Sequence, residues 1–361
     1  MAENKNDGMN YAPEVKTKGP VVKSGEFIFA AAHLDHGHIF GMCKGLTEAG
    51  GLCKYVYDLD PDKVSAFVKQ FPEAKPVADF GEILQNAEVQ MVASAGVTNT
   101  RGPTGVTVLE HGKDYFVDKA PFTTMAQLDA AKKAVEKTGK KYMVYYSERL
   151  HSESSVYAGQ LVHAGAIGRV IQVIGLGPHR LNAPSRPDWF FKREQYGGIL
   201  CDIGSHQVEQ FLYYTGAKDA EVLHSKIGNY NNPQYPELED FGDATLLADN
   251  GATHYFRVDW FTPDALPGWG DGRLVIMGTK GYIEVRKYLN ILGNPENGGH
   301  VFLVNEKDYI YTNVEGKVGC PYFGELILDC LNRTEIAMTQ AHAFKAAELC
   351  ITAQDKAVRV C

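Results

Sequence analysis

The sequence lacks several features that would point to particular classes of protein. No apolar run approaches the roughly 20 residues that a membrane-spanning helix needs. The 36 Lys and Arg residues against 44 Asp and Glu leave a net charge of −8, so there is no basic excess of the kind that binds nucleic acid. The polar segment 1–25 has no apolar stretch typical of a signal peptide. These absences argue against a membrane or nucleic-acid-binding protein and favour a cytoplasmic location.

The sequence also lacks closely spaced pairs of cysteines. The seven cysteines are scattered along the chain, and no two stand in a Cys-x-x-Cys arrangement. An odd number of irregularly spaced cysteines is typical of a reducing compartment. We therefore expect free thiols, again in agreement with a cytoplasmic protein.

The first half of the chain begins with the pattern of a dinucleotide-binding fold. The apolar run 27–32 predicts a buried strand, a turn at Gly37 leads into a helix over 39–49, and 53–57 predicts a second strand. Asp58 follows that strand about 20 residues beyond the turn, where an acid bonds the ribose hydroxyls of a dinucleotide. Because a carboxylate there repels a 2′-phosphate, the sequence favours NAD over NADP. The alternative is that Asp58 is the N-cap of the next helix.

The turn after the first strand departs from the usual Gly-x-Gly-x-x-Gly fingerprint. It reads Asp35-His36-Gly37-His38-Ile39-Phe40 and keeps only the middle glycine, the one that lets the backbone approach a pyrophosphate. We place Asp35, His36, Gly37, His38 and Ile39 at the cofactor phosphates. The imidazoles and carboxylate of 33–38 also allow a metal-binding interpretation. Adjacent residues of one tight turn rarely converge on one ion, however, so we predict no metal.

A lysine stands at a second informative place in the first half. The segments 89–94 and 115–117 predict strands, and Asp118-Lys119-Ala120-Pro121 follows the second of them. Ligands of open α/β sheets gather at the carboxyl ends of the strands. Lys119 is therefore a candidate to hold a substrate oxygen or the cofactor, with Asp118 beside it. The alternative is an ordinary solvent-exposed lysine.

The second half contains an acid and an imidazole directly after a glycine pair. Residues 197–206 read Gly-Gly-Ile-Leu-Cys-Asp-Ile-Gly-Ser-His. On a helix, Asp202 and His206 would share one face. A carboxylate next to an imidazole suits proton transfer at neutral pH. An ordinary capping or surface contact between the two is the alternative.

Taken together, these residues resemble the Gfo/Idh/MocA family, named after glucose–fructose oxidoreductase and inositol dehydrogenase. Asp118-Lys119-Ala120-Pro121 stands in the place of the family's Glu-Lys-Pro motif, with Lys119 on the catalytic lysine. Residues 197–206 match the family's Gly-Gly-x-x-x-Asp-x-Gly-x-His segment, and 273–283 look like its late strand pair. The chain departs from the family in its glycine fingerprint, in Asp118 for Glu, and in the proline displaced by Ala120.

The resemblance implies an α/β fold of two domains, which suits a chain of 361 residues. We expect a flexible arm over 1–25, a Rossmann dinucleotide-binding domain over 26–148, and an α+β domain over 149–361 with a large, open, mainly antiparallel sheet. Family members bury the far face of that sheet against another subunit. The resemblance therefore also implies a homodimer or homotetramer.

The implied activity is NAD-dependent hydride transfer between the cofactor and a hydroxyl-bearing carbon of a sugar, sugar derivative or cyclitol. His206 would accept the hydroxyl proton, Lys119 would hold the same oxygen, and Asp202 would position the two. The loop before the glycine pair offers candidate substrate contacts, unless they are ordinary loop residues: His179, Arg180, Trp189 and Lys192.

Three other functions stay open at this point. The same residues would serve an NAD-assisted sugar lyase or glycosidase that acts through transient oxidation of the sugar. The reduced glycine fingerprint would suit a non-catalytic binding protein with a dinucleotide fold. The histidines of 33–38 would suit a metal-dependent hydrolase.

Overall fold

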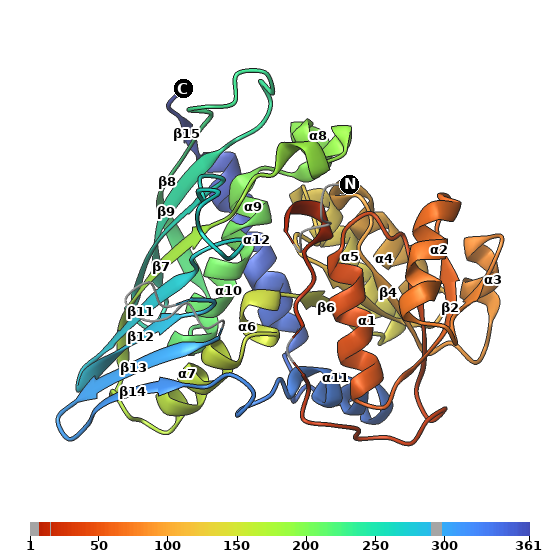
Figure 1. Cartoon of the computed structure of the whole chain (residues 1–361), viewed down its shortest axis with the longest axis horizontal. Coiled ribbons are helices and arrows are strands. Elements are labelled where there is room, and N and C mark those ends of the chain that lie inside the picture. Colours follow the sequence, from red (N-terminus) through yellow and green to blue (C-terminus); the bar gives the residue numbers. More distant parts are fainter. Residues whose placement is uncertain (1–6, 15, 290–297) are drawn as a thin grey trace. The chain divides into compact units, whose positions relative to one another are not determined.

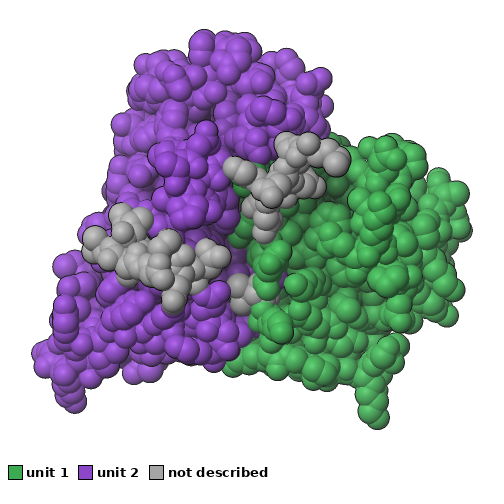
Figure 2. Space-filling view, viewed as in Figure 1, with its two compact units in different colours: residues 1–145, 321–344 green, residues 146–320, 345–361 purple. Residues whose placement is uncertain are grey.

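The computed structural model describes residues 7–14, 16–289 and 298–361, and the chain divides into two compact units (Figures 1 and 2). Unit 1 contains residues 1–145 and 321–344, and unit 2 contains 146–320 and 345–361. The segment 321–344, which we predict from the sequence as part of the second domain, lies in unit 1. Residues 1–6 and 15 of the expected arm fall outside the described residues.

Unit 1 is built on a six-stranded sheet in which all neighbouring strands are parallel, in the order β3-β2-β1-β4-β5-β6. The strands are β1 (Ile28–Ala32), β2 (Leu52–Tyr57), β3 (Lys75–Pro76), β4 (Met91–Ser94), β5 (Asp114–Asp118) and β6 (Tyr142–Tyr145). The order reverses between β1 and β4, which is the point where α/β proteins bind ligands at the carboxyl ends of their strands. The predicted Rossmann fold is confirmed.

Helices connect these strands, and one of them is longer than the sequence suggests. They are α1 (His38–Glu48), α2 (Pro61–Gln70), α3 (Phe80–Gln85), α4 (Thr98–Glu110) and α5 (Met125–Thr138). Helix α4 begins at Thr98, although its glycines and Pro103 usually indicate a loop. A Cβ at Gly105 would lie 2.2 Å from the Tyr142 ring and 2.7 Å from the Tyr115 ring. The glycine thus allows α4 to pack closely against the sheet.

The described part of segment 1–25 packs along α1. The short 3₁₀ turn η1 (Gly8–Asn10) lies at the start of α1, where the Met9 carbonyl accepts the Gly37 N–H at 2.8 Å. A Cβ at Gly37 would lie 2.6 Å from the Met9 oxygen, and one at Gly41 would lie 3.0 Å from Pro13. The glycines at the start of α1 thus make room for these residues of the expected arm.

The segment 321–344 joins unit 1 through helix α11 (Tyr322–Asn332) and the first residues of α12 (Gln340–Lys356). The Phe323 ring lies 6.4 Å from the ring of Phe116 and 6.1 Å from that of Tyr145. A Cβ at Gly45 of α1 would lie 2.5 Å from Phe323. The apolar face of α11 therefore completes the core of unit 1, although it is distant from the sheet in sequence.

Unit 2 contains a mixed, mostly antiparallel sheet of nine strands, in the order β14-β13-β12-β11-β7-β10-β9-β8-β15. The pairs β7–β10 and β8–β15 are parallel and the others are antiparallel. The strands are β7 (Val170–Pro178), β8 (Ala220–Gly228), β9 (Phe241–Ala248), β10 (Thr253–Asp259), β11 (Arg273–Gly278), β12 (Gly281–Arg286), β13 (His300–Asn305), β14 (Tyr309–Asn313) and β15 (Val358–Arg359). The predicted large, mainly antiparallel sheet is confirmed.

One face of this sheet carries helices, as Figure 1 shows. The helical segments of unit 2 before β8 are α6 (Ser147–Leu150), α7 (Glu153–His163), η2 (Ala183–Ser185), η3 (Asp188–Phe191), α8 (Arg193–Tyr196), α9 (Ile199–Asp202) and α10 (Gly204–Thr215). Helix α10 packs on β7 and β10, where the Phe211 ring stacks on His254 at 4.8 Å. Alternate strand residues point to the opposite face, and four apolar ones are between 37% and 46% exposed: Leu247, Tyr255, Met277 and Tyr282.

The structure bears on two expectations from the sequence, which are free thiols and the absence of a membrane-spanning helix. All seven cysteines are free, with six buried and Cys361 exposed. Among the described residues, none of the helices combines the length and the hydropathy needed to cross a bilayer.

The burial of His254 predicts a specific acid sensitivity. Burial lowers its pKa to about 4, below the ordinary value of 6.5. In the unfolded chain, His254 has its ordinary pKa and therefore binds a proton more readily than in the folded protein. Acidification thus favours the unfolded chain. The contribution of neutral His254 to stability is complete above about pH 6.5 and is lost as the pH falls towards 4. Between about pH 7 and pH 5, this group should remove about 2 kcal/mol from the free energy of unfolding.

Urea unfolding of wild type and His254→Phe at both pH values measures this contribution. The variant should lose about 2 kcal/mol less on acidification than wild type. His224→Phe, on an exposed position of β8, is the control and should follow the wild type. Equal pH dependence of His254→Phe and wild type would contradict the prediction.

Candidate active site

Lys119 lies directly beyond the carboxyl end of β5 in unit 1. Its side chain is 6% exposed, so the alternative of a solvated surface lysine is wrong. The Lys119–Ala120 peptide bond is cis. The residue thus has the buried, strand-end position that the sequence predicts for a ligand-binding lysine.

Asp118, the last residue of β5, is buried between two partners. One carboxylate oxygen is 2.8 Å from His38 Nδ1, and the other accepts from Arg101 Nη2 at 3.1 Å. Burial alone would raise the pKa of Asp118, but its interactions with the neighbouring His38 and Arg101 outweigh burial and hold that pKa well below its usual range. The structure thus brings together the predicted residues Asp118 and His38 and adds Arg101, an isolated cation early in α4 that the sequence analysis missed.

The turn that precedes α1 is closed by its own hydrogen bonds. His36 Nδ1 accepts the His38 N–H at 3.0 Å, and the His36 carbonyl accepts the Ile39 N–H at 3.2 Å. The Asp35 carboxylate accepts from Lys63 at 2.6 Å and from the Val97 N–H at 3.2 Å. Lys63 therefore offsets the negative charge that Asp35 would place near a phosphate.

The donor set of this turn does not suit a metal ion. Ligand atoms of His36, His38 and Asp118 lie within 4.8 Å of one another. However, both Asp118 oxygens are already bonded, and the Arg101 cation is one of their partners. His36 Nδ1 accepts a backbone N–H, which leaves the ring proton on its other nitrogen. These partners disfavour a cation here.

Asp58 lies at the end of β2 and is positioned by backbone donors. It accepts the Leu34 N–H at 2.6 Å and the Asp60 N–H at 2.9 Å. The N-cap of α2 is Asp60, whose carboxylate accepts the Asp62 N–H, so the alternative role for Asp58 is wrong. Lys63 Nζ is 4.0 Å from Asp58. The carboxylate is therefore held at the strand end with a cation nearby.

These residues fit a dinucleotide. Asp58 offers a carboxylate at the strand end where ribose hydroxyls bind, and the start of α1 offers amides for phosphates. Two of these amides, at Gly37 and His38, now donate to the Met9 carbonyl and to His36 Nδ1. Phosphate oxygens are acceptors of the same kind. To bind a dinucleotide, these two amides would therefore have to give up the Met9 carbonyl and His36 Nδ1 and donate to phosphate oxygens instead.

In unit 2, Asp202 and His206 lie on either side of a break in the helix. Asp202 is the last residue of α9, α10 begins at Gly204, and Ile203 separates them. The prediction of one continuous helical face is corrected to two successive helices. His206 is buried and Asp202 is half-buried.

The backbone conformation before α9 explains why two glycines stand there. Gly197 and Gly198 have φ values of 88° and 92°, a conformation that favours glycine. A Cβ at Gly198 would also lie 2.3 Å from the Gln354 side chain. Because of this conformation and the close approach of Gln354, the pair is required where α9 begins.

Two buried residues that the sequence analysis missed hold α9 in place. Glu239 accepts the Ile199 N–H at 2.9 Å, and Gln354 accepts the Leu200 N–H at 3.0 Å. Gln354 Nε2 also donates to both Glu239 oxygens, at 3.0 and 3.1 Å. Their only sequence signal is polarity within otherwise buried segments, which does not reveal their partners.

The four predicted substrate contacts differ in their surroundings. His179 lies 4.4 Å from the Trp269 ring, and its Nε2 is 3.6 Å from Glu148. Arg180 donates to the carbonyls of Pro263 and Leu266 and so holds a loop.

The other two contacts are near the surface. Trp189 is half-buried, while Lys192 forms an exposed ion pair with Glu237 at 3.1 Å. His179 and Arg180 are therefore more enclosed than these two. His179 also lies beside a buried ion pair of Glu148 and Lys287, which the sequence did not indicate.

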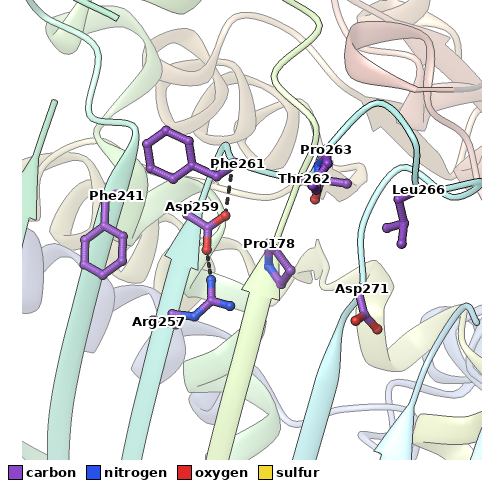
Figure 3. A pocket seen from close by; sticks show the side chains of 9 residues that line it. All are labelled: Pro178, Phe241, Arg257, Asp259, Phe261, Thr262, Pro263, Leu266 and Asp271. Atoms are coloured by element: carbon purple, nitrogen blue, oxygen red, sulfur yellow. Dashed lines mark hydrogen bonds and ion pairs between the residues drawn. The ribbon is translucent and has the colours of Figure 1, made fainter. Parts of the chain in front are cut away.

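A separate pocket of about 320 Å³ lies in unit 2 (Figure 3). Arg257 pairs with Asp259 in it, and the other Asp259 oxygen accepts the Phe261 N–H at 3.0 Å. Its lining includes Phe241 and Asp271 but none of the predicted site residues. Arg257 and Asp259 thus pair within the pocket, whereas Asp271 pairs with Arg273 outside its lining.

The chain is similar in sequence and structure to known oxidoreductases. The crystal structure of a candidate oxidoreductase from Erwinia carotovora atroseptica is 47% identical, with a TM-score of 0.90 over 93% of this chain and 100% of that one. Scyllo-inositol 2-dehydrogenase (NAD(+)) from Bacillus subtilis is 28% identical over 206 residues, 56% of each chain. Scyllo-inositol 2-dehydrogenase (NADP(+)) from the same organism is 22% identical over 152 residues, 42% of each. The chain thus matches little more than half the length of the NAD(+)-dependent scyllo-inositol dehydrogenase.

Two family descriptions match consecutive parts of the chain. The oxidoreductase family with an NAD-binding Rossmann fold matches residues 47–146. The C-terminal domain of the same family matches residues 156–284. The chain therefore belongs to the Gfo/Idh/MocA family of oxidoreductases.

Proposed function

We propose that this protein is an NAD-dependent dehydrogenase that acts on a hydroxyl-bearing carbon of a sugar, sugar derivative or cyclitol. The observation that carries the proposal is the buried Lys119 at the carboxyl end of β5, in a chain that also has the family's Asp202 and His206. The scattered free cysteines support a cytoplasmic location.

The cofactor would be held by the residues around the carboxyl ends of β1, β2 and β5. Asp58 would bond the adenosine ribose, and 35–39 would face the phosphates. Asp118 and Lys119 would lie towards the reactive end. When bound, NAD supplies the hydride acceptor.

Three side chains would remove the proton of the substrate hydroxyl and stabilise its oxygen. His206 accepts that proton as a general base, which an imidazole does well near neutral pH. Lys119 donates a hydrogen bond to the same oxygen and stabilises its developing negative charge. Asp202 positions the two groups.

The surroundings of His179 support a polyhydroxylated substrate. Its ring lies among Trp260, Trp269 and the carboxylate of Glu148. Aromatic faces suit the C–H faces of a sugar ring, and the polar groups suit its hydroxyls. The scyllo-inositol dehydrogenases among the relatives support the same class.

The position of Asp58 predicts a preference for NADH over NADPH. Repulsion between this carboxylate and a 2′-phosphate should weaken NADPH binding about tenfold or more. Fluorescence titration with both cofactors measures the ratio of dissociation constants. Asp58→Asn should reduce that ratio, whereas the exposed Asp62→Asn should leave it near the wild-type value. Tighter binding of NADPH by the wild type would contradict this assignment.

The proposed roles of Lys119 and His206 predict kinetic defects. Lys119→Ala and His206→Ala should each lower kcat about 10²-fold or more, with scyllo-inositol, myo-inositol or D-xylose as the tested substrate, while NADH binding changes little. The double variant should lose less than the product of the two single losses, because both groups act on one oxygen. The exposed Lys133→Ala and His224→Ala are controls. Near-normal turnover in either single variant would refute the mechanism.

The exposed apolar side chains of the unit 2 sheet support a homo-oligomer. We expect a dimer or tetramer in light scattering coupled to size-exclusion chromatography, because these side chains favour burial against a second copy. The double change Tyr255→Glu and Met277→Glu should shift the mass to the monomer. Ile336→Glu, an equally apolar exposed position in unit 1, should not. A wild-type protein that is monomeric at micromolar concentration would overturn the expectation.

A further inference from the structure

The turn that carries Lys119 is held by one buried arginine of α4. Arg101 Nη1 donates to the carbonyl of Asp118 at 3.3 Å, to that of Ala120 at 3.2 Å, and to that of Lys119 between them. Its Nε donates to the Gly96 carbonyl at 2.7 Å. Arg101 is 2% exposed. One side chain therefore bonds three consecutive carbonyls centred on Lys119.

The charge of Arg101 is balanced by the same turn. Its Nη2 donates to an Asp118 oxygen at 3.1 Å, and the other oxygen of that carboxylate meets His38. The guanidinium is planar and presents its donors in a fixed fork, whereas an ammonium is a compact point charge. The charge balance of the turn therefore depends on a cation at this place, whereas the position of the backbone depends on the fork of a guanidinium.

We propose that Arg101 is a positioning residue for Lys119, an inference that rests on the proposed function of that lysine. By fixing the carbonyls on either side of Lys119, Arg101 sets the direction in which its Cα–Cβ bond leaves the backbone. Displacement of a reacting group by about 1 Å can cost 10²-fold in rate. Arg101 thus acts on turnover through the backbone of its neighbour, without contact to the substrate.

The substitution Arg101→Lys separates geometry from charge. It keeps the cation beside Asp118 but removes the planar fork. We expect kcat to fall about 10- to 100-fold, while KM and the NADH dissociation constant stay within roughly threefold of wild type. In Arg101→Ala, guanidinium at non-denaturing concentration should restore part of kcat, since it refills the vacated donor position.

A second, exposed arginine of unit 1 provides a control. Arg333 pairs with Asp114, the first residue of the same strand β5, and also donates to a backbone carbonyl. Arg333→Ala should keep the wild-type kcat and should not respond to guanidinium. Because Arg333 is exposed whereas Arg101 is buried, thermal unfolding of both variants is needed to measure any loss of stability separately from kcat.

Hydrogen exchange of the cofactor-free protein gives a readout that needs no substrate. Within 118–122, every amide except that of Pro121, which has no N–H, should exchange faster in Arg101→Lys than in wild type, while those of 114–116 stay unchanged. Unchanged exchange over 118–122 would overturn the proposal even if no tested polyol is turned over. Wild-type kcat in Arg101→Lys, together with an inactive Lys119→Ala, would overturn it while leaving the proposed function intact. An active Lys119→Ala would instead remove the proposed function on which it rests.

Discussion

The burial of the Asp118 carboxylate is the constraint on which unit 1 depends. A charge in the protein interior is costly unless it is paired and hydrogen-bonded. Here the two partners come from the start of α1 and from α4, so β5, α1 and α4 are joined at one point. The position of the candidate lysine follows directly from the way this charge is neutralised. Loss of either partner would leave a buried, incompletely compensated carboxylate.

Unit 2 uses a second buried carboxylate for a similar purpose. Glu239 is fully buried, accepts hydrogen bonds from the backbone of α9 and from Gln354, and forms an ion pair with Arg193 at 3.3 Å. The segment with Asp202 and His206 therefore starts from a fixed point. In both units, a buried acid holds the backbone beside a candidate catalytic residue, and its partners come from segments distant in sequence.

This arrangement explains which features are visible in the sequence. The strands around Gly37 and Asp58 follow from local apolar patterns, and Lys119 stands out because it ends one of these strands. Arg101, Glu239 and Gln354 carry no such local signal, since their roles depend on partners that only the folded chain brings close. Tertiary packing also decided the early start of α4 and the place of α11 in unit 1.

The glycines at and within α1 follow a different spacing from the usual Gly-x-Gly-x-x-Gly fingerprint. Gly37, Gly41 and Gly45 recur once per turn, and each lies against another part of unit 1: η1, Pro13 and Phe323. In this chain, the glycines of the nucleotide-binding unit serve contact between its own segments more than a phosphate loop. A search for the usual loop fingerprint would therefore overlook proteins of this kind. A more suitable signature joins a first strand to a helix with Gly-x-x-x-Gly-x-x-x-Gly spacing, preceded by an N-terminal segment with a buried apolar residue at the position of Met9.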